Sequence, residues 1–121
     1  MPLQLIWWRC GWPQDWCSFD CKWISTVQTR GVYVIWYAEQ PSKIVQVGQG
    51  VIGERLRAHQ SDPEILLYAA RALKVSWAAA DDESMSGIEN YLASALDPLI
   101  ATARQVASPI KVNLPWDVSQ T

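Results

Sequence analysis

The sequence predicts a small mixed α/β domain of the α+β kind, with a three-stranded antiparallel sheet flanked by helices. Residues 31–37 (GVYVIWY) form an apolar run that is short for a helix and rich in β-branched and aromatic residues, which indicates a buried strand. Pro41 and Ser42 interrupt the run, and residues 44–47 predict a second strand, so the pair forms a hairpin. Residues 73–77 (LKVSW) alternate and indicate a third strand with one buried face.

Helical patterns fill the intervals between and after these strands. Apolar residues at helical spacing begin at Ile52 and Leu56, after a glycine-rich turn. Ser61 and Glu64 have the spacing of a capping box, which predicts a second helix. The longest helix follows the acidic residues of 81–84, and we expect a short continuation at 101–107. Its buried stripe consists of Met85, Ile88, Leu92, Leu96 and Leu99.

Length and composition fit one folded core. The chain has 121 residues, of which half are hydrophobic and 18% are charged, so disorder is excluded. The net charge of −2 and the pI near 5.2 provide no overall attraction to nucleic acid, so any such binding must depend on a local patch. No stretch approaches the ~20 apolar residues of a membrane span. The N-terminus lacks the pattern of a signal peptide, which favours a cytoplasmic protein.

Residues 1–29 form a segment rich in tryptophan and cysteine, which we expect to pack as a flap on a domain of residues 30–121. Two interpretations of its indole rings stay open: burial against the core, and a stacking platform for nucleic-acid bases. The rings belong to Trp7, Trp8, Trp12, Trp16 and Trp23.

The three cysteines have two interpretations. Cys17 and Cys21 have a permitted zinc-ligand spacing, but the segment offers no histidine and no fourth cysteine to complete a site. The odd number, including Cys10, and the absence of an export signal favour small, buried, reduced thiols.

Three polar residues have positions that suggest chemistry. Arg55 and His59 lie four apart on one helix, where their side chains can converge on a phosphate. Glu89 borders the buried stripe of the longest helix, where a carboxylate is costly unless it is compensated. It either pairs with Arg55 or another base, reaches water, or binds a divalent metal.

Gly48-x-Gly50-x-x-Gly53 also satisfies the dinucleotide-binding fingerprint, because it follows a strand and opens a helix. Against this interpretation, the preceding strand is predicted to pair in a hairpin, and too few strands are visible for a doubly wound sheet. The glycines more simply allow a tight turn from strand to helix.

Together, several of these residues resemble a GIY-YIG nuclease domain over residues 30–116. The resemblance rests on Gly31-Val32-Tyr33, on Val47-Gly48 after a short hairpin, and on the ordered residues Arg55, His59, Glu89 and Asn113. It implies a metal-dependent endonuclease that hydrolyses the phosphodiester bonds of DNA, with RNA as a second possible substrate.

The resemblance also implies roles for individual residues. Glu89 binds a single Mg²⁺ or Mn²⁺ ion, and Arg55 grips a phosphate oxygen. Tyr33 and His59 position or deprotonate the nucleophile, although Tyr33 could equally be a buried aromatic residue with a satisfied hydroxyl. Asn113 orients a neighbouring site residue or only caps a turn.

The sequence departs from the family pattern at Gln46, where the second motif has a tyrosine. Strand alternation places Gln46 on the same face as Ile44 and Gly48. An amide cannot usefully accept a proton near neutral pH, so catalysis is expected to be slow or to depend on Tyr33 and the metal. The alternative is a non-catalytic module on the same fold that binds nucleic acid or protein.

Two further cations could contact phosphates. Arg57 and Lys74 are interpreted as solvated charges or as nonspecific nucleic-acid contacts.

Overall fold

The computed structural model describes residues 3–10, 16–39, 42–100 and 106–115. Its strands are β1 (Cys17–Ser18), β2 (Arg30–Tyr37), β3 (Lys43–Val51) and β4 (Lys74–Ala79). The helices are α1 (Ile52–His59), α2 (Pro63–Leu66) and α3 (Asp82–Leu96), with 3₁₀ turns η1 (Lys22–Thr26) and η2 (Ala69–Arg71). Residues 101–105 of the helical continuation expected at 101–107, and the side chain of Trp12, lie outside the described residues, and residues 106–107 are not helical.

The strands form one antiparallel sheet in the order β1-β4-β2-β3. The mixed α/β class and the three expected strands are therefore confirmed, and the expected count is one strand short. The additional strand is the two-residue β1, which pairs with β4 through Cys17 and Val75. Two residues are too few to produce the alternation from which a strand is predicted.

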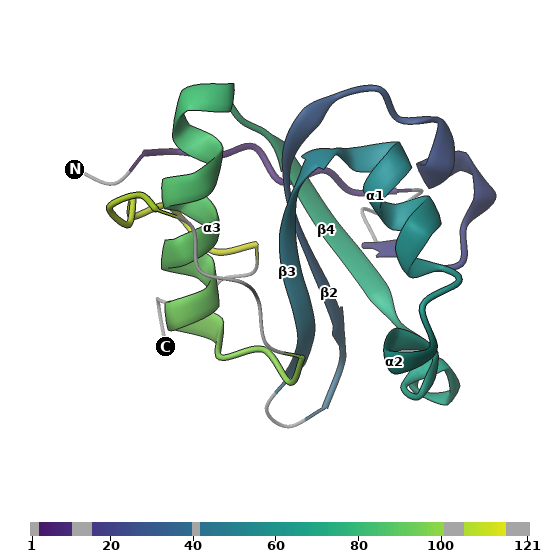
Figure 1. The fold of residues 1–121 in the computed structure, drawn as a ribbon. Coiled ribbons are helices and arrows are strands. Elements are labelled where there is room, and N and C mark those ends of the chain that lie inside the picture. Colours follow the sequence, from purple (N-terminus) through teal and green to yellow (C-terminus); the bar gives the residue numbers. More distant parts are fainter. Residues whose placement is uncertain (1–2, 11–15, 40–41, 101–105, 116–121) are drawn as a thin grey trace.

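Helices cover both faces of the sheet (Figure 1), with α1 on one side and α3 on the other. The side chains of β2 alternate between the two resulting cores, and residues 31–37 are all buried. This confirms a strand that is buried on both faces. On the α1 side lie Tyr33, Ile35 and Tyr37, and on the α3 side lie Val32, Val34 and Trp36.

The strand β3 is irregular near its start. Ile35 pairs with Gln46, but Trp36 pairs with Ile44, so Val45 is an extra residue in β3. Such a bulge reverses the faces of the residues before it. Ile44 consequently packs on the α3 side, whereas Val45 joins the α1 side.

Two helices differ from their predicted boundaries. The N-cap of α2 is Asp62, whose Oδ1 accepts a hydrogen bond from the Glu64 amide at 3.0 Å, and Ser61 lies before the cap. The helix α3 ends at Leu96 because Asp97 adopts a left-handed conformation, with φ 49°, before Pro98. Leu99 therefore lies outside the predicted stripe and is half-exposed.

The chain after α3 returns to the edge of β3. The amides of Leu99 and Ile100 donate to the carbonyl oxygens of Ile44 and Val45, at 2.8 and 2.9 Å. These bonds cover the start of the β3 edge and leave its other end, around Gly48 and Gly50, for side chains from the helices.

The N-terminal segment lies along the outer edge of β4. The Trp8 amide donates to the Trp77 carbonyl at 2.8 Å, and the two indole rings stack with centroids 5.2 Å apart. Further along, the Phe19 amide donates to Leu73 at 2.9 Å. Trp8 remains half-exposed, so its outer ring face is not covered by the core.

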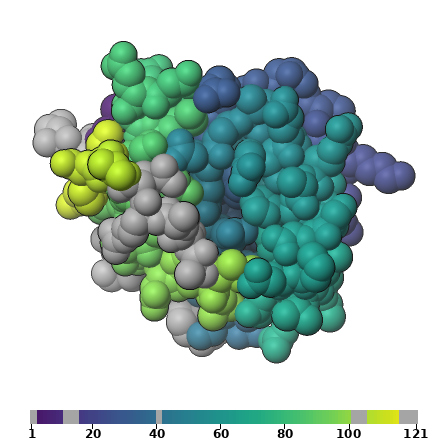
Figure 2. Space-filling model, in the orientation of Figure 1, coloured from purple at the N-terminus to yellow at the C-terminus, as the bar shows by residue number. Residues whose placement is uncertain are grey.

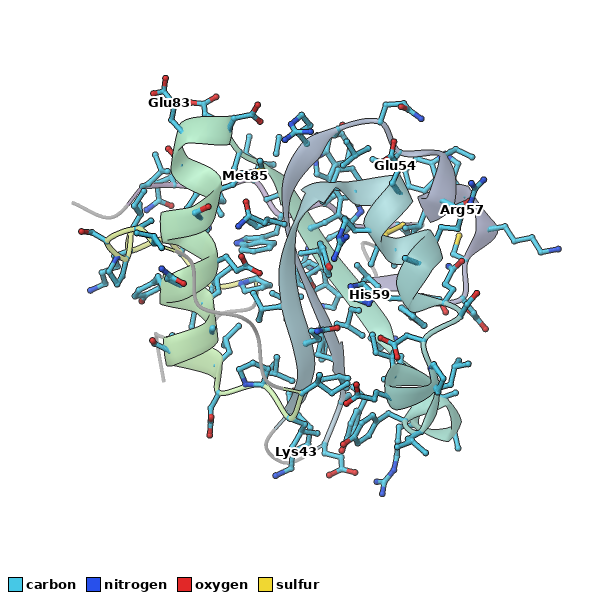
Figure 3. The ribbon with its side chains drawn as sticks, in the orientation of Figure 1. Lys43, Glu54, Arg57, His59, Glu83 and Met85 are labelled. Atoms are coloured by element: carbon cyan, nitrogen blue, oxygen red, sulfur yellow. A yellow bond between two sulfur atoms is a disulfide. The ribbon has the colours of Figure 1, made fainter. Side chains whose placement is uncertain are left out.

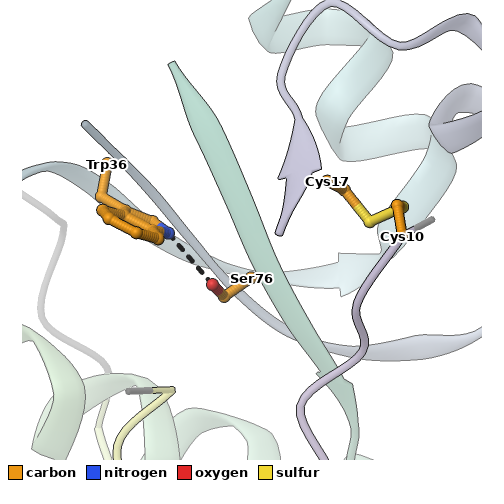
Figure 4. Close-up of a disulfide and its surroundings, with 4 residues drawn as sticks. All are labelled: Cys10, Cys17, Trp36 and Ser76. Carbon is orange, nitrogen blue, oxygen red and sulfur yellow. Dashed lines mark hydrogen bonds between the residues drawn. A yellow bond between two sulfur atoms is a disulfide. The ribbon is translucent and has the colours of Figure 1, made fainter. Parts of the chain in front are cut away.

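The expectation of reduced thiols is wrong for two cysteines. Cys10 and Cys17 form a disulfide, with their Cα atoms 4.8 Å apart (Figure 4), and Cys21 is the free thiol. Both bonded residues belong to segments that line the edge of β4, and this placement brings them within disulfide range. Spacing in the sequence cannot reveal such proximity.

In the described part of the chain, no helix has both the length and the hydrophobicity needed to cross a bilayer.

Candidate active site at the edge of β3

The site begins with a close contact between neighbouring strands. Tyr33 in β2 is paired with Gly48 in β3. A Cβ atom at residue 48 would lie 2.1 Å from the Tyr33 hydroxyl, a distance that non-bonded atoms cannot adopt. Glycine therefore allows the tyrosine ring to lie across β3 and to direct its hydroxyl toward the sheet edge.

The Tyr33 hydroxyl meets His59 in the last turn of α1. The hydroxyl oxygen lies 2.5 Å from Nε2, and the ring centroids are 5.5 Å apart. Figure 3 shows His59 between α1 and the sheet. On its other side, His59 Nδ1 lies 3.9 Å from Asp62 Oδ2.

Burial fixes the protonation states of this pair. It raises the pKa of Tyr33 to about 12, although a hydrogen bond from Arg55 and the positive charge of Arg55 act in the opposite direction. Burial, followed by the charge of Arg55, lowers the pKa of His59, against an opposing effect of Asp62. At neutral pH we therefore assign a neutral imidazole, whose Nε2 accepts a hydrogen bond from the phenol.

Arg55 reaches the same place across a second glycine. Gly50 has φ +128°, and a Cβ atom there would lie 3.1 Å from Cγ of Arg55. The aliphatic stem of Arg55 thus passes close to the β3 backbone where no side chain stands. Arg55 is exposed, so its guanidinium can exchange partners with a ligand.

Glu89 approaches β3 from the opposite face. It lies on α3 and is only 5% exposed, which confirms the position inferred from the stripe. Its Oε1 accepts a hydrogen bond of 2.6 Å from Nε2 of Gln49. Desolvation raises the pKa of the Glu89 carboxyl, and the Gln49 hydrogen bond and the charge of Arg55 partly oppose this effect.

The two sets of side chains can meet because β3 is an edge strand. Arg55 affects the pKa values of Tyr33, His59 and Glu89, so its charge lies close to groups from both sides of the sheet. Figure 2 shows a hollow on this face, between residues of α1 and α3, with residues of the hairpin strands inside it. The structure therefore brings together four of the predicted site residues.

Gln46 lies on β3, two residues before Gly48. The prediction of which neighbours share its face of the sheet is correct for Gly48 and wrong for Ile44. Gln46 shares the α1 side with Gly48, as expected, because its partner Ile35 packs there. The prediction that Ile44 lies on the same face is wrong, since the bulge at Val45 turns Ile44 to the α3 side.

Asn113 is engaged with the N-terminal segment. Its Oδ1 accepts a hydrogen bond from the Leu5 amide at 2.6 Å, and its Nδ2 donates to the Leu5 carbonyl at 2.9 Å. The Asn113 carbonyl also accepts a bond from the Trp7 indole at 2.9 Å. These contacts join two distant parts of the chain and differ from both a turn cap and an orienting contact with a site residue.

The two additional cations lie apart from the group. Arg57 is exposed and points away from the sheet on the outer side of α1 (Figure 3). Lys74 is paired with Trp36, so its side chain lies toward the α3 face of the sheet. It is also three residues away along β4 from Trp77, the residue that pairs with Tyr33.

The structure does not provide the arrangement that a dinucleotide site requires. The strand β3 is antiparallel to its neighbour, whereas the fingerprint needs a parallel βαβ unit. The first amides of α1 are also occupied, because Ile52 donates to Thr29 at 2.9 Å and Gly53 donates to Val27 at 2.8 Å. A pyrophosphate could not use those donors.

The predicted metal sites depend on which His, Cys, Asp and Glu side chains lie close together. Among the described residues, no group of three or more His, Cys, Asp or Glu side chains could hold a metal ion. The zinc interpretation of the cysteines also loses a ligand, because Cys17 is joined to Cys10 in a disulfide. A single carboxylate such as Glu89 still suits Mg²⁺, which retains several of its waters when bound to protein.

Two residues that contact the candidate site were not predicted from the sequence. Gln49 was considered only as part of a turn, although alternation from Gly48 places its side chain on the α3 face, toward Glu89. Asp62 was also overlooked, although it follows His59 by three residues, a spacing at which side chains meet in helical turns.

A separate cavity of about 420 Å³ lies near β1, α2 and η2. Gln60, in its wall, already donates to the Phe19 carbonyl at 2.8 Å. Since none of the predicted site residues lines this cavity, the β3 edge remains the candidate site.

No protein-family model, curated protein or solved structure matches this chain. Fold and site together define a mixed α/β domain with a four-stranded antiparallel sheet and a polar cluster at its edge.

Proposed function

We propose that this chain is a metal-dependent endonuclease domain of the GIY-YIG type, which hydrolyses phosphodiester bonds of DNA, or alternatively of RNA. The observation that carries the proposal is the convergence of the Tyr33–His59 pair, Arg55 and Glu89 around one edge strand. The group combines a proton acceptor, a permanent cation and a carboxylate, which are the parts that phosphodiester hydrolysis requires.

Glu89 is the residue that would hold the divalent ion. Its carboxylate is largely desolvated and receives only partial compensation from Gln49, so a cation beside it would lower the cost of its ionised form. Ser86 Oγ, 3.3 Å from Nε2 of Gln49, adds an oxygen to the surroundings. When bound, Mg²⁺ or Mn²⁺ supplies electrostatic stabilisation of the scissile phosphate and the leaving oxygen.

Arg55 binds a nonbridging phosphate oxygen in this proposal. Its charge is permanent and its planar fork matches phosphate geometry. Its exposure allows the guanidinium to leave Tyr33 and contact the substrate.

Tyr33 and His59 act as one proton relay. A buried phenol with a pKa near 12 is a poor base when it acts alone. With Nε2 as its acceptor, the phenol can pass its proton to His59 while its oxygen takes a proton from the attacking water. This arrangement does not need a tyrosine at residue 46.

The replacement at Gln46 supports the second candidate, a non-catalytic module that binds nucleic acid or protein. The net charge of −2 fits the protein-binding form of this module, because only the nucleic-acid-binding form must attract a polyanion. The two candidates differ in whether the protein catalyses the hydrolysis of nucleic acid.

Purified protein should be incubated with labelled single-stranded, duplex and branched DNA and with RNA, in Mg²⁺, in Mn²⁺ and in chelator. The nuclease proposal predicts metal-dependent cleavage that is lost in a Glu89→Gln variant. Binding without cleavage under every condition decides for the interaction module.

A further inference from the structure

The cavity of about 420 Å³ near β1 is separate from the β3 edge, and its volume falls in the range of small-molecule sites. It lies between the turn that follows β1, the end of α1 and the segment from α2 to β4, where α2 lies beside the start of β4 (Figure 1). The apolar part of its wall consists of Phe19, Leu66, Ala69, Ala72 and Leu73. Such a wall favours a ligand with a hydrocarbon body.

Two side-chain acceptors belong to the polar part of the wall. The first is the carboxylate of Asp20, whose Oδ1 accepts a hydrogen bond of 2.5 Å from the Ser18 hydroxyl. The second is Oε1 of Gln60. Nε2 of Gln60 donates to the Phe19 carbonyl at 2.8 Å, which fixes the orientation of the amide and leaves Oε1 for another donor. Both acceptors are therefore held in place by contacts within the protein.

The backbone of Ala72 provides an independent observation in the same wall. Ala72 has a left-handed conformation, with φ 56°, at the end of η2. Glycine or asparagine usually takes such a position after a helix, because a Cβ atom makes it strained. Strained residues are found preferentially at ligand sites. Alanine here keeps a methyl group in the cavity wall that glycine would remove.

We propose that this cavity binds a small primary amine with an apolar body, of the arylalkylamine class. The ammonium group donates to the Asp20 carboxylate and to Oε1 of Gln60, while the hydrocarbon body lies against the apolar wall. A hydrogen bond between an ammonium and a carboxylate is charge-assisted and stronger than a neutral one. Gln60 also caps the C-terminal end of α1, and this end of a helix favours a positive charge.

Lys22 also lines the cavity, and its charge opposes that of an ammonium ligand. Its side chain is exposed and flexible, so its own ammonium can lie in water while its methylenes border the apolar wall. Asp20 is more constrained, because it lies in a short turn that a 3.1 Å bond from the Cys21 amide to the Ser18 carbonyl closes. The fixed polar groups of the wall thus favour a cation, and the test includes an anionic ligand for comparison.

The test is calorimetric titration of the full chain with four matched compounds. Phenethylamine has the proposed charge and body, and phenethyl alcohol has the same body without a charge. Hydrocinnamate carries the opposite charge, and methylamine has the charge without the body. We expect phenethylamine to bind at least about 10-fold more tightly than the alcohol, which one hydrogen bond to a charged group provides. Hydrocinnamate and methylamine should bind more weakly than phenethylamine.

Variants then assign the contacts. Asp20→Asn should weaken phenethylamine at least about 10-fold and leave the alcohol unchanged. Asp81→Asn, at an exposed acid that does not line this cavity, is the matched control and should change neither.

Ala72→Gly separates a ligand contact from a structural role. It should weaken the amine and the alcohol alike, by about 4-fold for one methyl group. Its Tm should stay equal or rise, because glycine relieves the strain. A purely structural alanine would change Tm and leave both affinities as they are in the wild type.

Three outcomes overturn the proposal: no binding of phenethylamine at millimolar concentration, equal or tighter binding of the alcohol or of hydrocinnamate, and unchanged amine affinity in Asp20→Asn. The first two use the wild type alone, so they stay decisive if a variant folds poorly. None of these outcomes bears on cleavage at the β3 edge, because the residues of that site do not line the cavity.

Discussion

The Tyr33 hydroxyl lies 2.5 Å from Nε2 of His59, in space that the absence of a side chain at Gly48 leaves open. The contact joins the centre of the sheet to the last turn of α1. It also connects the buried phenol to an imidazole whose Nδ1 lies 3.9 Å from Asp62. A strand, a helix and the residue that caps α2 thus meet at one imidazole.

His59 should make stability depend on pH. Burial and Arg55 lower its pKa in the folded state, while the unfolded value is near 6.5. Below about 6.5 the unfolded chain therefore binds more protons, and stability falls as the pH falls toward the folded-state pKa. We expect wild type to lose more stability than His59→Gln between pH 7.5 and 5, measured by urea unfolding. A difference between the two proteins that is constant with pH would contradict the assignment of a neutral imidazole.

Gly48→Ala should damage both stability and the site. The added Cβ would meet the Tyr33 hydroxyl at 2.1 Å, so the ring must move away from His59. Overpacking of this kind costs about 1–3 kcal/mol in the free energy of unfolding. Urea unfolding of Gly48→Ala in wild-type and Tyr33→Val backgrounds provides the control. An equal cost in both backgrounds would show that the clash with Tyr33 is not the cause.

The main strands were predictable because alternation and apolar runs are local signals. The bulge at Val45 was not, because an extra residue in one strand is defined by its partner and leaves the pattern almost unchanged. One extra residue then reversed the expected face of Ile44. The pairing of β1 with β4 has the same explanation, since the partners of Cys17 and Ser18 lie more than fifty residues further along the chain.

In the candidate site, too, some contacts follow from local spacing in the sequence and others depend on tertiary packing. The convergence of Arg55 and His59 follows from helical spacing alone. Their meeting with Tyr33 depends on the register of Tyr33 with Gly48 and on the packing of α1, neither of which is encoded locally. The partner of Glu89 was missed because Gln49 reaches it from a strand forty residues earlier.

The disulfide should contribute measurably to stability. Cys10 and Cys17 enclose a short loop, for which loop-closure entropy gives roughly 2.5 kcal/mol. We expect a reductant to lower the free energy of unfolding of wild type by about this amount. Cys10→Ser should already be weakened and insensitive to reductant. Cys21→Ser should keep the reductant sensitivity of wild type, because Cys21 is the free thiol. If reductant has no effect on wild type, the Cys10–Cys17 bond does not stabilise the fold.

Arg55→Lys should impair turnover more than binding. Lysine keeps the positive charge but loses the planar fork that can hold two phosphate oxygens and contact Tyr33 together. The expected result is a large fall in single-turnover rate with a small change in Kd for DNA, measured in Ca²⁺ to prevent cleavage. Arg57→Lys, on the outer side of the same helix, is the matched control and should change neither. Equal activity of Arg55→Lys and wild type would reduce Arg55 to a general electrostatic contact.

Glu89→Gln should separate a metal ligand from a structural carboxylate. Desolvation raises the pKa of Glu89 in the folded state, so its ionised form is disfavoured by folding. The associated stability is present below the unfolded pKa and is lost as the pH rises through the folded pKa. At pH 8 Glu89→Gln should therefore be at least as stable as wild type, and its advantage should shrink as the pH falls through the folded-state pKa and disappear below 4.5. Calorimetric titration with Mn²⁺ should show binding to wild type and none to the variant. Unchanged Mn²⁺ binding would remove Glu89 as the ligand, whereas a loss of about 3–5 kcal/mol at pH 8 would instead identify it as half of a buried ion pair.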